Sequence, residues 1–283
     1  MELDSGIIFA SAADLLKEDL GRGDITTQSV VRGGVKARGR FLAKQEFVLC
    51  GLEIAEAVFS TLDNNIRLES RAYDGETIAA DTEFARIEGA AAVLLTGERT
   101  ALNILQHLSG VATLTKAFVD RIEGTSAKIV DTRKTTPGLR LLEKYAVTVG
   151  GGSNHRFGLD DGVLIKDNHI ALAGGVKRAV ELARSAVSHL MKIEVEVGNG
   201  SQLREAIAAR ADVIMLGNMS LDEIRESVKL IREQTPGTII EISGGVTLEN
   251  VRQFADCGVD LISVGAITRS ATAVDISLKT RPL

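Results

Sequence analysis

The sequence of 283 residues has no tryptophan and two tyrosines. Proteins that bind single-stranded nucleic acid usually stack bases on aromatic side chains, so this class is poorly supported. Positive charge is also scarce, because 33 lysines and arginines face 38 acidic residues and the formal net charge is −5. No block of like charges occurs that would form a long surface for a duplex. We therefore expect no nucleic-acid partner.

Cysteine is limited to Cys50 and Cys257, which lie far apart and do not have the spacing of metal ligands. A disulfide framework is thereby excluded, and we expect a reduced, cytoplasmic setting. The N-terminal stretch "MELDSGIIFASAADLLKEDLG" lacks a basic region before an apolar run, so we expect mature sequence rather than a signal peptide. No apolar run approaches the length of a membrane span, and we expect no membrane partner.

The chain is 45% hydrophobic, and its length suits one large domain or one large and one small domain. Its first part has a mixed pattern. A short helix is predicted over 11–19, a strand or strand pair over 35–51 and a helix over 52–62. Residues 90–122 form a long helical stretch, for which we predict two helices divided near Gly110.

From about residue 127 the pattern changes to short apolar runs that alternate with amphipathic helices. This alternation predicts βαβ units and a parallel sheet, which makes the fold class α/β. The pattern leaves open whether the sheet is doubly wound or a (β/α) barrel. The six predicted strands lie in "AKIVDT", "GVLIKD", "MKIEVEV", "DVIMLG", "TIIEIS" and "DLISVG".

Chemically capable residues follow these strands directly. In both architectures ligands bind at the carboxyl ends of parallel strands, so residues distant in sequence converge there. The residues concerned are Asp131, Arg133 and Lys134 after the first strand, Lys166, Asp167 and Asn168 after the second, Glu196, Asn218, then Ser243, Gly244 and Gly245, and finally Gly265.

Each candidate also has an ordinary structural interpretation. Arg133 and Lys134, taken alone, are best explained as solvated loop cations, although such a pair also suits a carboxylate or phosphate. Lys166 ends an apolar strand and must find an anion, which is either Asp167 or Glu196 or a bound phosphate. These two alternatives are balanced.

Glycines near the strand ends raise the same question. The run 150–152 before His155 and Arg156 is either a flexible turn or a place where backbone N–H groups approach an anion. The glycines after the last two strands either hold a phosphate or serve tight βα turns. His169 is best explained as a helix-capping or buried structural histidine.

Longer motifs make the chain resemble the quinolinate phosphoribosyltransferase family over nearly its whole length. They are "EDLGRGDITT", "TGERTALNILQHLSGVAT", "DTRKTTPGLRLLEKYAV", "GGGSNHRFGLDDGVLIKDNHI", "IEVEV" and "EISGGV". The resemblance implies an N-terminal α/β sandwich domain over 1–111 and an open C-terminal (β/α) barrel over 112–268. It also implies that 269–283 returns to the N-terminal domain, and that the protein is a homodimer or a higher oligomer with shared sites.

The implied reaction is phosphoribosyl transfer from phosphoribosyl pyrophosphate to quinolinate with decarboxylation, which gives nicotinate mononucleotide for NAD biosynthesis. Mg²⁺ accompanies the phosphoribosyl pyrophosphate, and the catalytic residues are Lys134, Lys166 and Glu196. The resemblance implies that Arg133, His155 and Arg156 line the quinolinate pocket and that Arg99 reaches this pocket from the neighbouring subunit. It also implies that Lys134 and Lys166 lie between the two substrates, and that Glu196 faces the ribose hydroxyls or, through water, the magnesium ion. The residues implied to surround the 5-phosphate are Ser243, Gly244, Gly245 and Gly265.

Two positions depart from the family pattern. Gly217 stands where the family usually has aspartate, and Arg269 where it often has histidine. Gly217 either removes a carboxylate from the ribose or metal or makes a tight turn that needs positive φ. Two further hypotheses are a molybdate-operon-associated homologue and a catalytically weakened protein that binds phosphoribosyl ligands.

Overall fold

The computed structural model describes residues 3–283, which divide into two compact units. The N-terminal unit contains the chain up to Lys116 together with Gly138–Gly151 and Ser270–Leu283. The barrel unit contains Ala117–Pro137 and Gly152–Arg269. Residues 138–151 thus lie in the N-terminal unit although they fall between two segments of the barrel unit.

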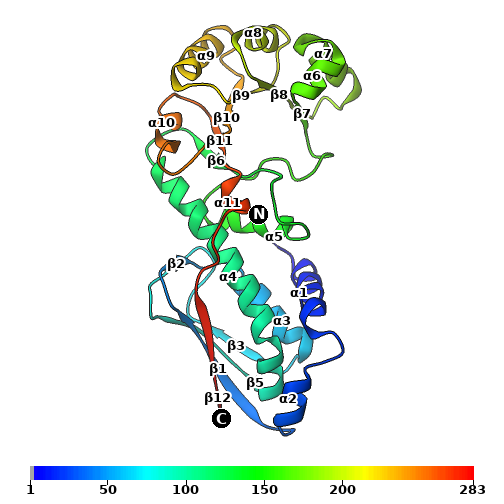
Figure 1. Cartoon of the computed structure of the whole chain (residues 1–283), viewed down its shortest axis with the longest axis vertical. Helices are drawn as coiled ribbons and strands as arrows, with labels where there is room; N and C mark the ends of the chain where they lie inside the picture. Colours follow the sequence, from blue (N-terminus) through cyan, green and yellow to red (C-terminus); the bar gives the residue numbers. More distant parts are fainter. Residues whose placement is uncertain (1–2) are drawn as a thin grey trace. The chain divides into compact units, whose positions relative to one another are not determined.

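The N-terminal unit is built on a four-stranded antiparallel sheet in the order β12-β1-β5-β3. Buried residues alternate along β1, so one face of the sheet carries the core. The last strand returns to the first and pairs with it from Ala43↔Ile276 to Ala37↔Pro282 (Figure 1). The strands are β1 (Lys36–Ala43), β3 (Arg67–Ser70), β5 (Glu83–Ala90) and β12 (Ile276–Pro282), with β2 (Phe47–Val48) and β4 (Thr77–Ile78) as a separate pair.

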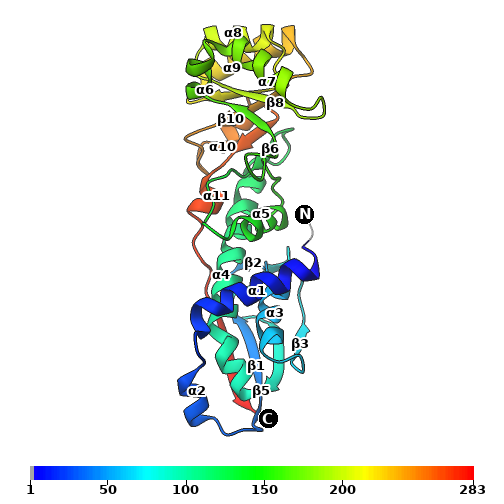
Figure 2. The same ribbon diagram turned by 90° about the vertical axis from the view of Figure 1, so that its right-hand side faces the viewer.

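Helices α1 and α3 lie side by side in this unit (Figure 2). Asp4 caps α1 by accepting a hydrogen bond from Ile7 N at 3.0 Å, so α1 begins earlier than the predicted helix over 11–19. No helix within residues 3–283 combines the length and apolar character needed to cross a bilayer. The helices are α1 (Ser5–Leu20), α2 (Ile25–Val30), α3 (Leu52–Leu62), α4 (Ala91–Arg121) and α5 (Arg140–Val149).

The predicted division of residues 90–122 at Gly110 is wrong, because α4 is one helix. Gly110 is needed for close packing instead. A Cβ atom at this position would overlap the backbone carbonyl of Thr272 and lie 3.3 Å from the Cα atom of Ala273. Glycine lowers helix propensity but does not by itself end a helix when packing supports the segment.

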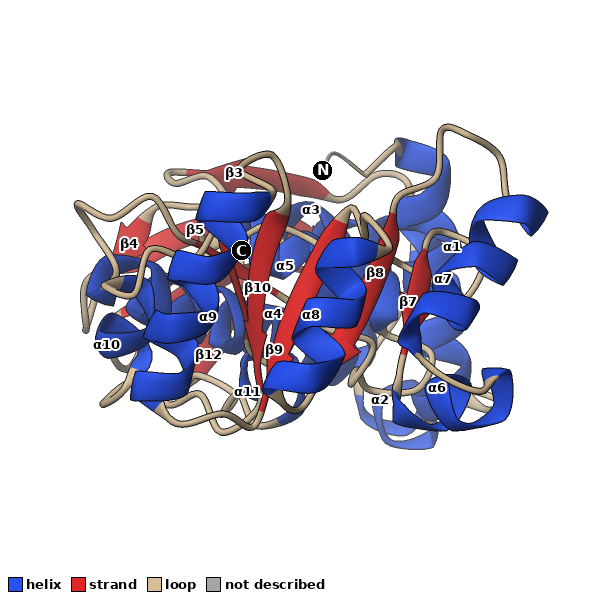
Figure 3. Ribbon diagram, turned by 90° about the horizontal axis from the view of Figure 1, so that it is seen from above, coloured by secondary structure: helices blue, strands red, loops and turns tan. Residues whose placement is uncertain are grey.

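The barrel unit contains all six predicted strands in one parallel sheet, in the order β6-β11-β10-β9-β8-β7. Figure 3 shows β7 to β10 side by side with α8 in front of them. Within the described residues, the end strands β6 and β7 do not pair with each other, so the barrel is open. The strands are β6 (Lys128–Val130), β7 (Val163–Ile165), β8 (Ile193–Val197), β9 (Val213–Gly217), β10 (Ile239–Ser243) and β11 (Leu261–Ser263), and the helices are α6 (Asp167–Ala173), α7 (Val176–Ala186), α8 (Gly200–Ala208), α9 (Leu221–Gln234), α10 (Val251–Ala255) and α11 (Ala266–Arg269).

The strand register brings the polar residues onto one face of this sheet. Glu196 on β8 pairs in register with Met215 on β9, which in turn pairs with Glu241 on β10. Two residues further along, Gly217 is in register with Ser243. Because side chains of residues in register point to the same face, these positions line the inside of the barrel at the carboxyl ends of its strands.

Candidate active site

A cavity of about 310 Å³ opens at the carboxyl ends of the barrel strands. Six residues predicted from the sequence line it, so the structure brings together residues that are more than a hundred positions apart. Glu196 reaches this site through its contact with Lys166. The lining residues are Thr132, Arg133, Lys134, His155, Arg156, Leu164, Lys166, Met215, Glu241, Ser243 and Ser263.

The wall of the cavity is strongly cationic, with Arg133, Lys134, Arg156 and Lys166 around one opening. Burial, and next to it the charge of Arg133, lowers the pKa of Arg156 below its usual value. Arg156 is held in place by a hydrogen bond from Nη1 to the carbonyl oxygen of Gly162 at 2.8 Å. Gathering like charges costs free energy unless an anion binds among them, which favours an anionic ligand.

Lys166 forms an ion pair with Glu196, and Nζ lies 3.1 Å from Oε2. The Lys166 side chain is 48% exposed, and pairs this accessible contribute little to stability. The pair therefore leaves an ammonium group that an anion can approach. His169 accepts a hydrogen bond at Nδ1 from the backbone N–H of Lys166 at 3.0 Å, which confirms its predicted helix-capping role.

Gly217 lies next to the Glu196 side chain. A Cβ atom at Gly217 would be 3.0 Å from Glu196 Oε1 and 3.3 Å from its Cγ. The backbone of Gly217 is not left-handed, whereas Asn218, the next residue, has φ 53°. The interpretation of Gly217 as a turn that needs positive φ is therefore wrong, and the absent side chain leaves space that Glu196 occupies.

The glycines after β10 and β11 have two different structural reasons. Gly244 and Gly245 have φ of 100° and 64°, so the turn after β10 requires residues that tolerate left-handed backbone. Gly265 allows a close approach, because its Cβ atom would lie 3.1 Å from Lys134 Cδ. Arg269 is exposed at the end of α11.

The glycine run before His155 is explained by packing and turn geometry. A Cβ atom at Gly150 would overlap the backbone carbonyl of Ala112 on α4 and lie 2.7 Å from Thr115 Cβ. Gly151 has φ 86°. These two glycines belong to the N-terminal unit, so they shape the chain before the site rather than line the cavity.

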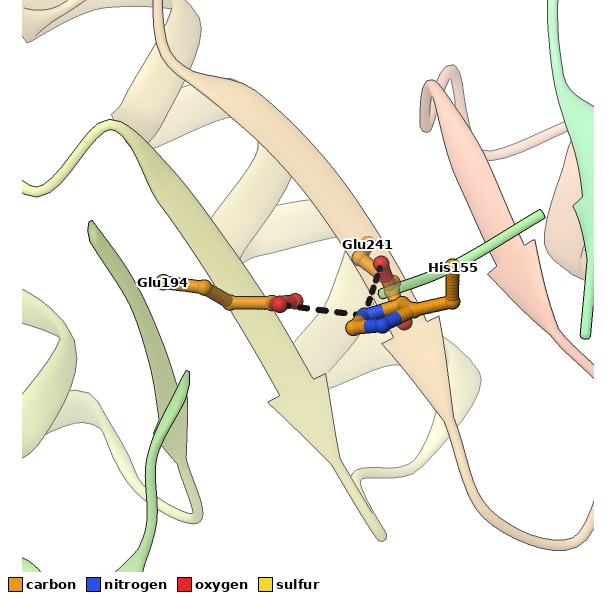
Figure 4. Close-up of side chains that lie close together, drawn as sticks. All are labelled: His155, Glu194 and Glu241. Atoms are coloured by element: carbon orange, nitrogen blue, oxygen red, sulfur yellow. Dashed lines mark hydrogen bonds and ion pairs between the residues drawn. The ribbon is translucent and has the colours of Figure 1, made fainter. Parts of the chain in front are cut away.

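His155 is fixed by hydrogen bonds on both ring nitrogens. Nδ1 accepts the backbone N–H of Arg156 at 2.8 Å, and Nε2 lies 3.1 Å from Glu194 Oε2 and 3.6 Å from Glu241 Oε2. Figure 4 shows the two carboxyl groups approaching the ring from different strands. Since Nδ1 accepts a backbone hydrogen, the proton of the neutral ring is on Nε2. Asp131 supports this arrangement by accepting a hydrogen bond from His155 N at 2.9 Å.

The group of His155, Glu194 and Glu241 also has a spacing that would suit a metal ion, with its ligand atoms within 4.8 Å of one another. A histidine nitrogen binds metal only when it carries no proton. Because Nε2 carries the proton here, the geometry favours a hydrogen-bonded cluster over a metal centre.

Glu241 is the most perturbed carboxyl group of the cavity, and its side chain is 1% exposed. Burial, followed by the charge of Glu194, raises the pKa of Glu241 to about 8, against a smaller opposite effect of His155. The Oε1 atoms of Glu194 and Glu241 are buried and have no hydrogen-bond partner. Ionisation of Glu241 would place a second charge beside Glu194 in a desolvated site, so both burial and this neighbour favour the protonated form of Glu241.

Comparison with protein families shows to which family the chain that forms this cavity belongs. The model of the quinolinate phosphoribosyl transferase N-terminal domain matches residues 24–109, and that of the C-terminal domain matches residues 111–279. The chain belongs to the quinolinate phosphoribosyltransferase family.

Individual members of the quinolinate phosphoribosyltransferase family are similar over nearly their whole length. The probable nicotinate-nucleotide pyrophosphorylase [carboxylating] of Bacillus subtilis is 48% identical over 92% of this chain and 89% of its own. The nicotinate-nucleotide pyrophosphorylase [carboxylating] of Mycobacterium leprae is 42% identical over 93% of both chains. The solved structure of the Francisella tularensis nicotinate-nucleotide pyrophosphorylase has a TM-score of 0.93 at 40% identity, over 99% of this chain and 98% of that chain.

Sequence reasoning missed two residues of the cluster in this quinolinate phosphoribosyltransferase chain, Glu194 and Glu241. A signal was present, because each is a glutamate inside an apolar strand, in "IEVEV" and "TIIEIS". A carboxylate inside a buried strand needs partners. Arg99 lies on α4 in the N-terminal unit and is not among the residues that line the cavity of the barrel unit.

Proposed function

We propose that this protein transfers the phosphoribosyl group of phosphoribosyl pyrophosphate to quinolinate and removes one carboxylate, which gives nicotinate mononucleotide, pyrophosphate and carbon dioxide. It is a pentosyltransferase of NAD biosynthesis. The observation that carries this proposal is the cavity with four cationic side chains in a chain whose relatives are named nicotinate-nucleotide pyrophosphorylase [carboxylating]. A dicarboxylate beside a polyphosphate is the kind of ligand pair that such a wall binds.

The cationic residues have distinct roles in this reaction. Arg133 and Arg156 hold the quinolinate dianion, because guanidinium groups bind carboxylates through two parallel hydrogen bonds and so fix its orientation. Lys134 and Lys166 stabilise the charge that develops on pyrophosphate as it departs. The turn of Ser243, Gly244 and Gly245 surrounds the 5-phosphate together with Gly265, since the left-handed Gly244 and Gly245 present backbone N–H groups to an anion.

Magnesium bound to phosphoribosyl pyrophosphate would fit beside Glu196. Carboxylate oxygen is a preferred ligand type for Mg²⁺, which keeps several waters and binds mainly to substrate phosphates. Because Gly217 provides no second carboxylate and Glu196 pairs with Lys166, we assign Glu196 a contact to the ion through water or to the ribose hydroxyls. When bound, the ion would neutralise the charge of the leaving pyrophosphate.

We also propose that the protein acts as a homodimer or higher oligomer in the cytoplasm, with Arg99 entering the neighbouring subunit's site. The support for the shared site is that Arg99 lies outside the barrel unit. Both cysteines are free, which agrees with a reducing compartment.

One assay tests the proposed function. The protein is incubated with quinolinate, phosphoribosyl pyrophosphate and magnesium chloride, and nicotinate mononucleotide and carbon dioxide are measured. Formation of both in equal amounts is expected. Tight binding of both substrates without turnover would instead identify a catalytically weakened binder. The relatives favour the carboxylating transferase over a molybdate-operon-associated homologue.

Replacing Arg156 by alanine is expected to weaken quinolinate binding. The loss of one charge-assisted hydrogen-bonded contact costs roughly 1.5–3 kcal/mol, which corresponds to about 10- to 150-fold in Kd. Calorimetric titration of the free enzyme with quinolinate measures this value. Arg178→Ala removes the same charge from an exposed position on α7 and serves as the control. An Arg156→Ala protein with the Kd of the Arg178→Ala control would contradict the assignment of the pocket.

Mixing two inactive variants is expected to restore activity if sites are shared between subunits. Arg99→Ala and Lys166→Ala proteins are each purified, mixed and allowed to exchange subunits. Random exchange puts both intact residues into about a quarter of all sites, so activity should rise towards about a quarter of the wild-type value. Light scattering and mass spectrometry establish the exchange. Proven exchange without recovered activity would show that Arg99 does not act across an interface.

A further inference from the structure

We propose that Glu241 is the acid that delivers a proton to the ring carbon from which the carboxylate departs. The proposal deepens the proposed function and rests on it. Loss of carbon dioxide breaks the bond between ring carbon C2 and its carboxylate, and the electron pair of this bond remains on C2 beside the positively charged ring nitrogen. As this bond breaks, the electron pair takes the proton of the Glu241 carboxyl group, so proton transfer accompanies the loss of carbon dioxide, and solvent later returns a proton to the Glu241 carboxylate.

The position of Glu241 meets the first requirement for such an acid. Its side chain lines the cavity and is 1% exposed, so the donated proton does not exchange freely with bulk water at the moment of reaction. It also lies on the inner face of the barrel between Met215 and Leu261 in register, at the centre of the sheet.

Four other polar side chains of the cavity are less suitable. Arginine does not give up a proton in proteins, which excludes Arg133 and Arg156. Lys166 Nζ is paired with Glu196 Oε2 at 3.1 Å. The Nε2 proton of His155 is directed to Glu194, while Nδ1 accepts the backbone hydrogen of Arg156.

Two buried carboxyl groups lie against Nε2 of His155, and ionisation of both is disfavoured in a desolvated site. His155 Nε2 lies nearer to Glu194 Oε2, at 3.1 Å, than to Glu241 Oε2, at 3.6 Å. The shorter hydrogen bond thus goes to Glu194, and the charge of Glu194 favours the protonated form of Glu241. Glu241 Oε1 is buried and has no hydrogen-bond partner within the geometric limits of a hydrogen bond.

Charged groups of both signs near the cavity affect the protonation of Glu241. The charge of Glu194 on β8 favours the protonated form of Glu241. The cationic side chains around the opening of the cavity, called the rim cations here, favour the ionised form of Glu241 that follows proton donation. Burial and the charge of Glu194, against smaller opposite effects of His155 and Ser263, raise the pKa of Glu241 to about 8. The rim cations are Arg133, Lys134, Arg156 and Lys166.

The test separates phosphoribosyl transfer from decarboxylation in a single turnover. Glu241→Gln keeps the size and polarity of the side chain but holds no acidic proton. Pyrophosphate is expected at the wild-type rate, while carbon dioxide is released at least about 100-fold more slowly, because positioned general acids contribute about 10²–10⁴-fold. Mass spectrometry should detect the phosphoribosylated dicarboxylate that accumulates between the two steps.

Glu194→Gln is the matched control, since it changes the neighbouring buried carboxyl group and leaves the donor. Without the charge of Glu194, the pKa of Glu241 falls, so this variant should regain fast carbon dioxide release when the pH is lowered. Glu241→Gln should not regain it at any pH. Rescue of both variants by low pH, or of neither, would overturn the assignment of Glu241 as the donor.

A measurement on the unaltered protein makes the test independent of how the variants fold. Because the protonated form donates, carbon dioxide release should fall as the pH rises through about 8, while pyrophosphate release should not show this decline. Equal rates of both products in Glu241→Gln, or loss of pyrophosphate release in a variant with the wild-type melting temperature, would overturn the proposal. Wild-type protein that forms no nicotinate mononucleotide would instead refute the proposed function.

Discussion

Gly217→Asp is expected to lower kcat/KM by roughly 10²–10³-fold, the loss typical for a misplaced preorganised polar group. Its Cβ atom would lie 3.0 Å from Glu196 Oε1, so Glu196 must move. The new carboxylate would also place a second negative charge beside Glu196 and compete for Lys166. This expectation contrasts with the simple idea that restoring an aspartate supplies a missing ligand and speeds the reaction.

Steady-state kinetics with saturating magnesium, together with thermal melting, would decide between these outcomes. Gly217→Ala is the matched control, because it adds the Cβ atom without the charge and should lose less activity than Gly217→Asp. Melting temperatures of both variants should stay near the wild-type value, since Gly217 does not have left-handed backbone. Faster turnover or tighter binding of phosphoribosyl pyrophosphate in Gly217→Asp would show that the carboxylate had been missing.

Gly150→Ala is expected to destabilise the protein by about 3 kcal/mol, because the new Cβ atom would overlap the backbone carbonyl of Ala112 and crowd Thr115. Neither the α4 backbone nor α5, which ends at Val149, can shift without disturbing the core. Differential scanning calorimetry should show a fall in Tm of roughly 6–12 °C for this loss.

Gly33→Ala provides the control for Gly150→Ala in the same unit. No atom lies within 4 Å of a Cβ built at Gly33, and its φ is not left-handed. This variant should melt close to the wild type. A Gly150→Ala protein that melts with it would show that the glycine run is a flexible turn with room for side chains.

The barrel strands could be predicted from sequence because each is a short apolar run with turn residues beside it. Whether the sheet closes could not be predicted, since this depends on whether β6 and β7, at opposite edges of the sheet, pair with each other. The helix α4 shows the same limit, because the close approach of Thr272 to Gly110 joins positions 162 residues apart. A local sequence pattern shows the hydrophobic periodicity of a helix or strand, but it does not show which residues far away in the sequence pack against that element.

The cationic residues of the site could be predicted from the sequence, but the two buried carboxyl groups could not. Arg133 and Lys166 follow strand ends, a position that itself indicates function in parallel sheets, and Arg156 follows the glycine run. Glu194 and Glu241 meet at His155 across the intervening strand β9, a contact that depends on register and on the curvature of the sheet. Likewise, the sequence does not show that Glu196 occupies the space that a side chain at Gly217 would need, because this contact joins two different strands.

The open edge of the barrel has a consequence for local stability. Strand β7 hydrogen-bonds to β8 alone, whereas β9 and β10 have a strand on each side. Opening β7 breaks one ladder, and opening a central strand breaks two, so local unfolding and amide exchange begin at β7 at a lower free energy. Lys166 follows this strand directly, so its ammonium is attached to an edge of the sheet that opens more easily than the centre. An anion bound to both Lys166 and the cations on other strands would close this edge and raise the free energy of its opening.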